Sequence, residues 1–378
     1  MDRYRKTVFG GGSILKNYIF QASFILGILL FIVDPVFSAE KKWFPVDVDV
    51  WNPPYNKARQ REQKKYIPLE KAQKKWHLRV FIPHLKDAYW LGVNYGLIDE
   101  ARRLGISLTI YQAGGYGQLT VQRNQINSVL SNSAQKTDGL IICAISETGL
   151  NDIVKKAAEI KIPVLDLING MSSTHISARA AVSYWDTGFQ AGIYLSRIQQ
   201  KMKKRLSIAW FPGPEGAGWV TAGDRGFRDA IKGHDVKILT SQRADTGSAA
   251  QGKLVQTALD RYGERLDFII GTTVTAETAV KIIRQLGFKN KVQVLSYYYS
   301  PGVHRGIRRR NIVAAPSDHQ VLQARIGIDT LVRIIEKKSY FKHVAPRVTV
   351  VDQNNIQSWD SSTTLAPRGF RPVFSINE

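Results

Sequence analysis

The stretch LRVFIPHLKDAYWLGVNYGLIDEARRLGISLTIYQ (Leu78–Gln112) carries the clearest local structure signal in this chain. Its first segment, LRVFIPHL, and its last, ISLTIYQ, are apolar and rich in residue types that favour strands. Between them, apolar residues recur at spacings of three or four, the pattern of a helix with one buried face: Trp90, Val93, Leu97, Ala101 and Leu104. The stretch therefore predicts a strand, a helix and a second strand, which together form a βαβ unit of a parallel sheet.

The same alternation continues along the chain. Strands are predicted at GLIICAI and IPVLDLI, with the helix TGLNDIVKKAAEI between them, and RAAVSYW, which ends at Trp185, is predicted as a further strand. After a long helix the pattern begins again at LSIAWFPG and continues through LDFIIGTT and VQVLSYYY. The sequence thus predicts two similar α/β lobes in series, with parallel sheets covered by helices, an arrangement that commonly encloses a ligand between the lobes.

The two N-terminal segments differ from the rest in composition. Residues 1–39 combine early basic residues with the apolar run YIFQASFILGILLFIV and small residues near Ser38 and Ala39, which predicts a cleavable export signal. An uncleaved membrane anchor is the alternative. Residues 40–75 are basic, aromatic and proline-bearing, and we expect either an extended arm that docks through Trp43, Trp51 and Tyr55 or a partly disordered linker. We expect the mature protein in the periplasm, with membrane contact only through an uncleaved signal or a partner.

Several functional classes find no support in the sequence. The formal net charge is +22, but the basic residues are scattered and no nucleic-acid-binding motif accompanies them, so no nucleic-acid partner is expected. The histidines lack metal-ligand spacing, and no cofactor motif is found. Cys143 lies in the apolar stretch DGLIICAI and is expected to be a buried, inert thiol. We therefore expect no cofactor, no metal and no enzymatic activity.

Aromatic residues follow the ends of predicted strands, where open parallel sheets bind their ligands: Tyr89, Trp90, Tyr116, Trp185 and the triplet Tyr297–Tyr299. Asp87 precedes the first pair and is expected to cap the helix, with ligand contact as a second role. Ring faces attract a positive nitrogen, and methyl groups on that nitrogen are apolar, so the set suits a methylated amine. Packing between the lobes is the alternative explanation for any single ring.

Several blocks of sequence resemble the type I periplasmic binding proteins, whose two Rossmann-like lobes are joined by three crossings of the chain. A narrower resemblance is to the TorT-type sensors of trimethylamine N-oxide within that family. It is carried by LKDAYWLGVNYGLIDEARRLGISLTIYQAGGYGQL, FPGPEGAG, VLSYYYSPGVHRGIRRRNIVAAPSD and the terminal GFRPV, and it covers roughly Trp76 to the C-terminus. The resemblance places the crossings near Trp185, Ser317 and His343. It implies a first lobe of residues 76–185 plus 318–342 and a second lobe of residues 186–317 plus 343–378.

The resemblance implies a function as well as a fold. It implies a periplasmic protein that binds trimethylamine N-oxide in an aromatic cage and regulates a TorS-like histidine kinase through the periplasmic sensor domain of that kinase. The ligand-binding residues that it implies are Asp87, Tyr89, Trp90, Tyr116, Trp185 and Tyr298, with Tyr297 and Tyr299 as alternatives to the last. The alternative function is a periplasmic sugar- or polyol-binding protein of an ABC transporter. Tyrosine and tryptophan, however, outnumber the polar side chains that sugar sites use.

Overall fold

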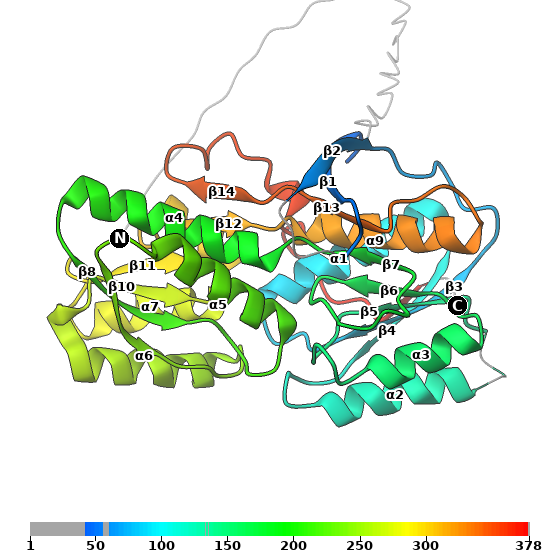
Figure 1. Cartoon of the computed structure of the whole chain (residues 1–378), viewed down its shortest axis with the longest axis horizontal. Coiled ribbons are helices and arrows are strands. Elements are labelled where there is room, and N and C mark those ends of the chain that lie inside the picture. The colour runs from blue at the N-terminus through cyan, green and yellow to red at the C-terminus, as the bar shows by residue number, and fades with distance from the viewer. Residues whose placement is uncertain (1–41, 56–59, 133, 135, 377–378) are drawn as a thin grey trace, which may run out of the picture. The chain divides into compact units, whose positions relative to one another are not determined.

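The structure is a computed structural model that describes residues 42–55, 60–132, 134 and 136–376. The predicted export signal lies outside these residues. Trp43–Glu378 form one compact unit. In the part of the chain that the structure describes, this unit contains two large sheets, and we call the part built on each sheet a lobe (Figure 1).

The first lobe is built on a nine-stranded sheet whose central strands are parallel. Helices α1 and α9 pack against each other over one face, and α2 and α3 lie on the other (Figure 1). The strands, in spatial order, are β15 (Ser375–Ile376), β4 (Ser107–Gln112), β3 (His77–Ile82), β5 (Gly139–Ile142), β6 (Val164–Leu167), β7 (Ala178–Ala180), β13 (His343–Pro346), β1 (Val46–Trp51) and β2 (Arg61–Tyr66). The helices are α1 (Ala88–Leu104), α2 (Leu119–Ser131), α3 (Asn151–Glu159) and α9 (Gln320–Ile335).

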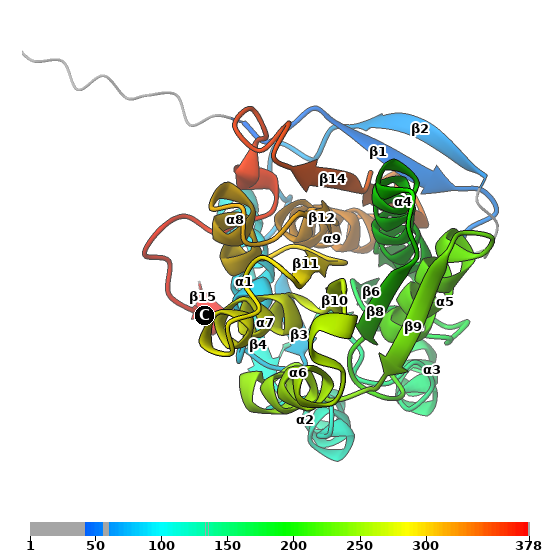
Figure 2. The same cartoon turned by 90° about the vertical axis from the view of Figure 1, so that its left-hand side faces the viewer.

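The second lobe is built on a parallel four-stranded sheet: β11 (Gln293–Ser296), β10 (Phe268–Gly271), β8 (Leu206–Phe211) and β9 (Val236–Ser241). Figure 2 shows one pair of helices on each side of it: α4 (Tyr184–Met202) with α5 (Gly218–Ile231), and α6 (Ser248–Tyr262) with α7 (Thr273–Gln285). Short elements complete the chain: η1 (Gly263–Arg265), α8 (Pro301–Arg308), η2 (Ser361–Thr363) and the antiparallel pair β12 (Ala314–Ser317) and β14 (Thr349–Asp352).

The predicted fold class is confirmed, because buried apolar runs form parallel strands and helices cover both faces of each sheet. The proposed division of the C-terminal region needs correction. Residues 343–378 were assigned to the second lobe, but β13 pairs with β7 and β1, and β15 pairs with β4, all in the first sheet. Only the segment around β14 leaves that sheet, because it pairs with β12.

The N-terminal arm is part of the first lobe. Strands β1 and β2 form an antiparallel hairpin that extends the first sheet beyond β13. The Trp51 ring stacks on His343 at 3.9 Å between centroids, and the Trp43 Nε1–H donates to Glu100 Oε2 at 2.9 Å. The buried Tyr66 hydroxyl donates to Asp329 Oδ2 on α9 at 2.6 Å. These contacts favour the docked arm over the linker that the sequence left as an alternative.

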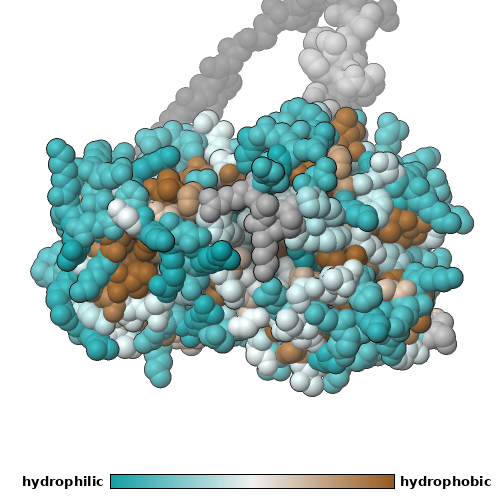
Figure 3. Space-filling model, viewed as in Figure 1, coloured by the Kyte–Doolittle hydropathy of each residue, from teal (hydrophilic) through white to brown (hydrophobic). Residues whose placement is uncertain are grey.

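The surface reflects the composition. Hydrophilic side chains cover most of the face shown in Figure 3, with smaller hydrophobic patches between them. Among the described residues, no helix is long and apolar enough to cross a membrane.

Candidate ligand-binding site

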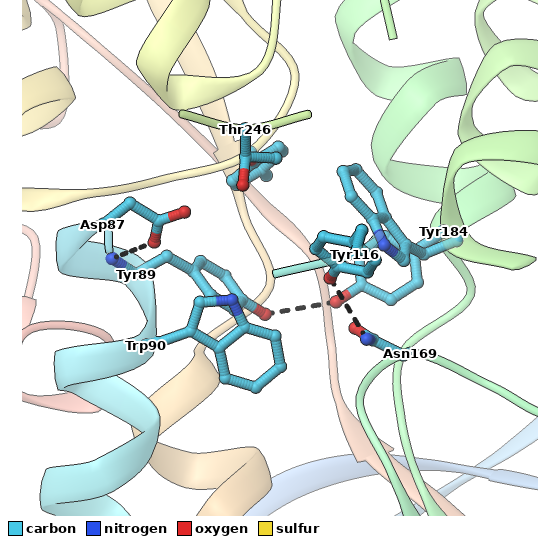
Figure 4. A pocket seen from close by; sticks show the side chains of 9 residues that line it. Asp87, Tyr89, Trp90, Tyr116, Asn169, Tyr184 and Thr246 are labelled. Atoms are coloured by element: carbon cyan, nitrogen blue, oxygen red, sulfur yellow. Dashed lines mark hydrogen bonds between the residues drawn. The ribbon is translucent and has the colours of Figure 1, made fainter. Parts of the chain in front are cut away.

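Loops and helix starts from both lobes form a small cavity (Figure 4). Six of the nine lining residues are tyrosine or tryptophan, and the other three are polar. The lining residues are Asp87, Tyr89, Trp90, Tyr116, Asn169, Tyr184, Trp219, Thr246 and Tyr298. The six aromatic residues are each 9% exposed or less, so the cavity is cut into the hydrophobic core.

The β3–α1 connection supplies one wall of the cavity. Asp87 has extended backbone angles at the N-cap of α1, and its side chain accepts a hydrogen bond from the Tyr89 N–H at 3.1 Å. This cap fixes the first turn of α1, so the side chains of Tyr89 and Trp90 project from the helix close to the end of β3. The Tyr89 hydroxyl donates to Asp318 Oδ2 at 2.6 Å and lies 3.1 Å from the Tyr184 hydroxyl. The opening aromatic pair of the helix is thereby held at the cavity.

The loop after β4 brings in Tyr116. Gly114 and Gly115 have φ values of 96° and 148°, at which a residue with a side chain would be strained. These two glycines turn the chain sharply just before Tyr116. The Tyr116 hydroxyl accepts a hydrogen bond from Asn169 Nδ2 at 3.1 Å, and the same amide group donates to the Ala144 carbonyl at 2.8 Å. Two strand ends of the first lobe, those of β4 and β6, thus support one ring.

Helices α4 and α5 place Tyr184 and Trp219 by packing very closely. A Cβ added at Gly226 would lie 1.9 Å from the Trp185 carbonyl oxygen, and one at Gly188 would lie 2.0 Å from that of Gly223. Only glycine permits this approach. It brings the start of α4 against α5, and the Tyr184 and Trp219 rings lie 6.0 Å apart at the cavity wall.

The expectation for Trp185 needs correction. The residue does not end a strand, because β7 stops at Ala180 and Ser183 caps α4 by accepting from the Asp186 N–H. Trp185 therefore lies in the first helical turn, about 100° around the axis from its neighbour Tyr184. Its Nε1–H donates to Asp229 on α5 at 2.8 Å, and its ring stacks on Phe189. Tyr184 takes the place at the cavity that was expected of Trp185.

Two polar contacts join the lobes beside the cavity. His84 is fully buried after β3, and its Nδ1 accepts from the Lys86 N–H at 3.3 Å. Its Nε2 therefore carries the hydrogen and donates to Thr246 Oγ1 of the second lobe at 3.1 Å. Burial lowers the pKa of His84 to about 4, so the ring is neutral at pH 7. Outside this contact, Lys86 Nζ pairs with Asp245 at 3.0 Å in an exposed ion pair.

Two carboxyl groups beside the cavity have raised pKa values. Burial raises the pKa of Asp87 to about 6, although hydrogen bonds from the Trp90 and Tyr89 backbone oppose the shift. Burial also raises the pKa of Asp318 to about 6, against the hydrogen bond from the Tyr89 hydroxyl. Both groups are thus largely ionised at pH 7 and become protonated as the pH falls through about 6.

The tyrosines of the cavity remain protonated. Burial raises the pKa values of Tyr116 and Tyr184 well above the ordinary value for tyrosine, so both keep their hydroxyl hydrogens. The cavity therefore combines ring faces, tyrosine hydroxyls and one carboxylate. Among the described residues, no group of three or more His, Cys, Asp or Glu side chains could hold a metal ion.

Of the expected site residues, Asp87, Tyr89, Trp90, Tyr116 and Tyr298 line the cavity, and Trp185 does not. Tyr297 and Tyr299 are fully buried elsewhere, and Tyr298 is the member of the triplet that reaches the wall. Sequence reasoning missed Asn169, Tyr184, Trp219 and Thr246. A signal existed for Trp219, because it closes the glycine-rich stretch PGPEGAGW at a strand end.

Comparisons with known proteins agree with this architecture. Residues 79–339 match the model of the family described as periplasmic binding protein domain. The periplasmic protein TorT of Escherichia coli (strain K12) is 34% identical over 304 residues, which cover 80% of this chain and 86% of that protein.

Two groups of solved structures are also similar. An ABC transporter solute-binding protein from Bradyrhizobium sp. BTAi1, with bound Bis-Tris, is 45% identical with a TM-score of 0.76 and covers 88% of this chain and 99% of that one. TorT in complex with the TorS sensor domain, solved without ligand and with trimethylamine N-oxide (TMAO), is 27% identical with TM-scores of 0.70 and 0.69. These two structures cover 79% of this chain and 99% of TorT.

Proposed function

We propose a function from a plain premise: this chain belongs to the family of periplasmic binding protein domains. Within this family, its proposed function is that of a sensor. It resides in the periplasm after its export signal is cleaved, binds trimethylamine N-oxide in the aromatic cavity, and reports the bound state to a TorS-like sensor histidine kinase.

The single observation that carries this proposal is the composition of the cavity wall. Six buried rings and one carboxylate line a small space, and sugar-type hydrogen-bonding side chains are few. A ring face over a desolvated methylated nitrogen contributes about 0.5 to 2 kcal/mol. Several such faces together offset the cost of immobilising a very small ligand. The carboxylate of Asp87 adds attraction for the positive nitrogen.

The proposed partner follows from the similarity to TorT and from the proposed role as a binding protein without catalysis. A binding protein that neither transports nor reacts can report its ligand only through a surface that differs between the free and bound states. TorT is a relative at 34% identity, and TorT has been solved with the TorS sensor domain. We place the contact surface across both lobes, because the cavity is built from both and a ligand there acts on their relative position.

A transport function is the second candidate, and one finding favours it. The Bradyrhizobium protein at 45% identity is described as an ABC transporter solute-binding protein, with bound Bis-Tris, a polyhydroxylated amine. A buried sugar or polyol needs a hydrogen-bond partner for each hydroxyl. The non-aromatic polar side chains of the wall are Asp87, Asn169 and Thr246, and both amide hydrogens of Asn169 are already donated to protein groups.

Thermal-shift and calorimetric titration separate the two candidates. Purified protein is titrated with trimethylamine N-oxide, glycine betaine, choline, D-ribose and Bis-Tris. We expect trimethylamine N-oxide to bind most tightly and to raise the unfolding midpoint by mass action. Stabilisation by a sugar or by Bis-Tris, with no response to trimethylamine N-oxide, would favour the transport function over the sensor function.

A further inference from the structure

One wall of the cavity presents hydrogen-bond donors without acceptors. The Trp219 Nε1–H is buried, the residue being 5% exposed, and it has no hydrogen-bond partner among the described residues. An indole N–H can only donate, and its approach to the neighbouring Tyr116 hydroxyl falls short of hydrogen-bond geometry, so the group can still donate to an acceptor on a ligand. Trp219 lies beside Tyr116, with ring centroids 5.9 Å apart, and both line the cavity.

Tyr116 adds a second donor at the same place. Its hydroxyl oxygen already accepts a hydrogen bond from Asn169 Nδ2, so the hydroxyl hydrogen is directed elsewhere. The raised pKa of Tyr116 keeps that hydrogen on the oxygen at neutral pH. An N–H and an O–H therefore stand next to each other at one end of the cavity, and both require an acceptor.

The opposite side of the cavity carries a negative charge. In Figure 4, Asp87 lies to the left of the cavity, whereas Tyr116 and Asn169 lie to its right. Among the described residues, no lysine or arginine forms an ion pair with Asp87, and its neighbour Lys86 pairs with Asp245 instead. The cavity is thus polarised, with a carboxylate at one end and two unsatisfied donors at the other.

We propose that this polarity orients the ligand, with the N-oxide oxygen accepting hydrogen bonds from Trp219 Nε1–H and the Tyr116 hydroxyl and the methylated nitrogen turned toward Asp87. This inference rests on the proposed function and assigns the specificity of the site. Trp219 and Tyr116 select the oxygen of an N-oxide, and Asp87 together with the ring faces selects the positive nitrogen.

A consequence separates N-oxides from ammonium ions of similar size. Tetramethylammonium has a methyl group where trimethylamine N-oxide has its oxygen. When it fills the cavity, the Trp219 and Tyr116 donors are buried without acceptors. Such a loss costs about 1 to 3 kcal/mol for each unsatisfied group, or roughly 5-fold to 150-fold in affinity. Tetramethylammonium in turn carries a full positive charge, so it depends more on Asp87 than the net-neutral N-oxide does.

The test compares two probes on four forms of the purified full chain: wild type, Tyr116→Phe, Asp87→Asn and the control Tyr262→Phe. Tyr262 does not line the cavity, and its hydroxyl donates to the Leu239 carbonyl at 3.0 Å. The dissociation constants of trimethylamine N-oxide and tetramethylammonium are measured by calorimetry, with competition against the tighter ligand where direct heats are small.

We expect Tyr116→Phe to weaken trimethylamine N-oxide about tenfold and to change tetramethylammonium less than about twofold. Asp87→Asn should weaken tetramethylammonium more than trimethylamine N-oxide, and Tyr262→Phe should change neither. The orientation is refuted if Tyr116→Phe weakens both probes equally or leaves the N-oxide unaffected. Failure of the wild type to bind trimethylamine N-oxide at all would instead remove the proposed function on which the inference rests.

Discussion

Two neighbouring residues in the first turn of α4 give the sharpest test of the cavity assignment. Tyr184 lines the cavity, and its hydroxyl lies 3.1 Å from the Tyr89 hydroxyl and 3.4 Å from Asp318 Oδ2. Trp185 faces α5 and bonds to Asp229. The perturbation is a matched pair, Tyr184→Leu and Trp185→Leu, which removes one ring from the same helical turn while leaving an aliphatic side chain of moderate size.

The magnitudes follow from what each ring contacts. Tyr184→Leu removes one ring face from the methylated nitrogen, worth about 0.5 to 2 kcal/mol, or roughly 2-fold to 30-fold in the dissociation constant for trimethylamine N-oxide. Trp185→Leu removes a partly buried ring that contacts Phe189 and Asp229 outside the cavity, so we expect a change below about twofold.

The assay is calorimetric titration with trimethylamine N-oxide, and circular dichroism melting shows whether each variant is folded. Leucine is preferred to alanine here because Tyr184 is 7% exposed and belongs to the main hydrophobic cluster, where a cavity-forming change would also lower the free energy of unfolding. If both variants fold and Trp185→Leu weakens binding as much as Tyr184→Leu does, then Tyr184 is not the ligand-binding member of this pair.

Three further predictions concern protons, the contact between lobes, and the arm. Burial raises the pKa of Asp87 to about 6, and the charged and polar groups near it are Glu277, Thr246 and Tyr298. Near pH 6, binding of trimethylamine N-oxide should therefore release protons, because the positive nitrogen favours the ionised form of Asp87. Affinity should therefore fall as the pH falls through about 6, and calorimetry in two buffers of different ionisation enthalpy gives the proton count, with proton uptake as the contrary result. Asp245→Asn should change affinity less than about fivefold, and less at high salt, because its exposed pair with Lys86 is worth under about 1 kcal/mol; a larger, salt-independent loss would contradict this. Tyr66→Phe should lower the free energy of urea unfolding by about 1 to 3 kcal/mol through the lost hydrogen bond to Asp329 while leaving ligand affinity unchanged, and normal stability would show that the arm contributes little there.

The fold could be predicted from sequence because its signals are local. Apolar strands and helices of period 3.6 alternate along most of the chain, and each strand end is marked by a polar or glycine-bearing turn. The residues at those ends, such as Asp87 and Tyr116, could therefore be located by position, whereas their expected role in ligand binding also drew on the family resemblance. The cap at Asp87 also followed from its residue type.

The remaining features depend on contacts between distant segments. Whether Tyr184 or Trp185 faces the cavity is decided by the residue at which α4 begins, and a shift of one residue turns a helical side chain by about 100°. Asp318 supports Tyr89 and Tyr184 from the link between β12 and α9, a position that no local pattern connects to them. The pairing of β13 with β1 is equally non-local and escaped prediction.

The proposed function requires that ligand binding to this protein be communicated to a kinase. If the ligand changes the affinity of this protein for its partner, thermodynamic linkage requires the partner to change the affinity for the ligand by the same factor. The decisive measurement is the dissociation constant of trimethylamine N-oxide, determined by calorimetry with and without a saturating TorS-like sensor domain. We predict a difference of roughly 5-fold to 150-fold, matched by an equal change in kinase affinity with ligand. Identical dissociation constants in the two titrations would show that this protein does not report its ligand to the kinase.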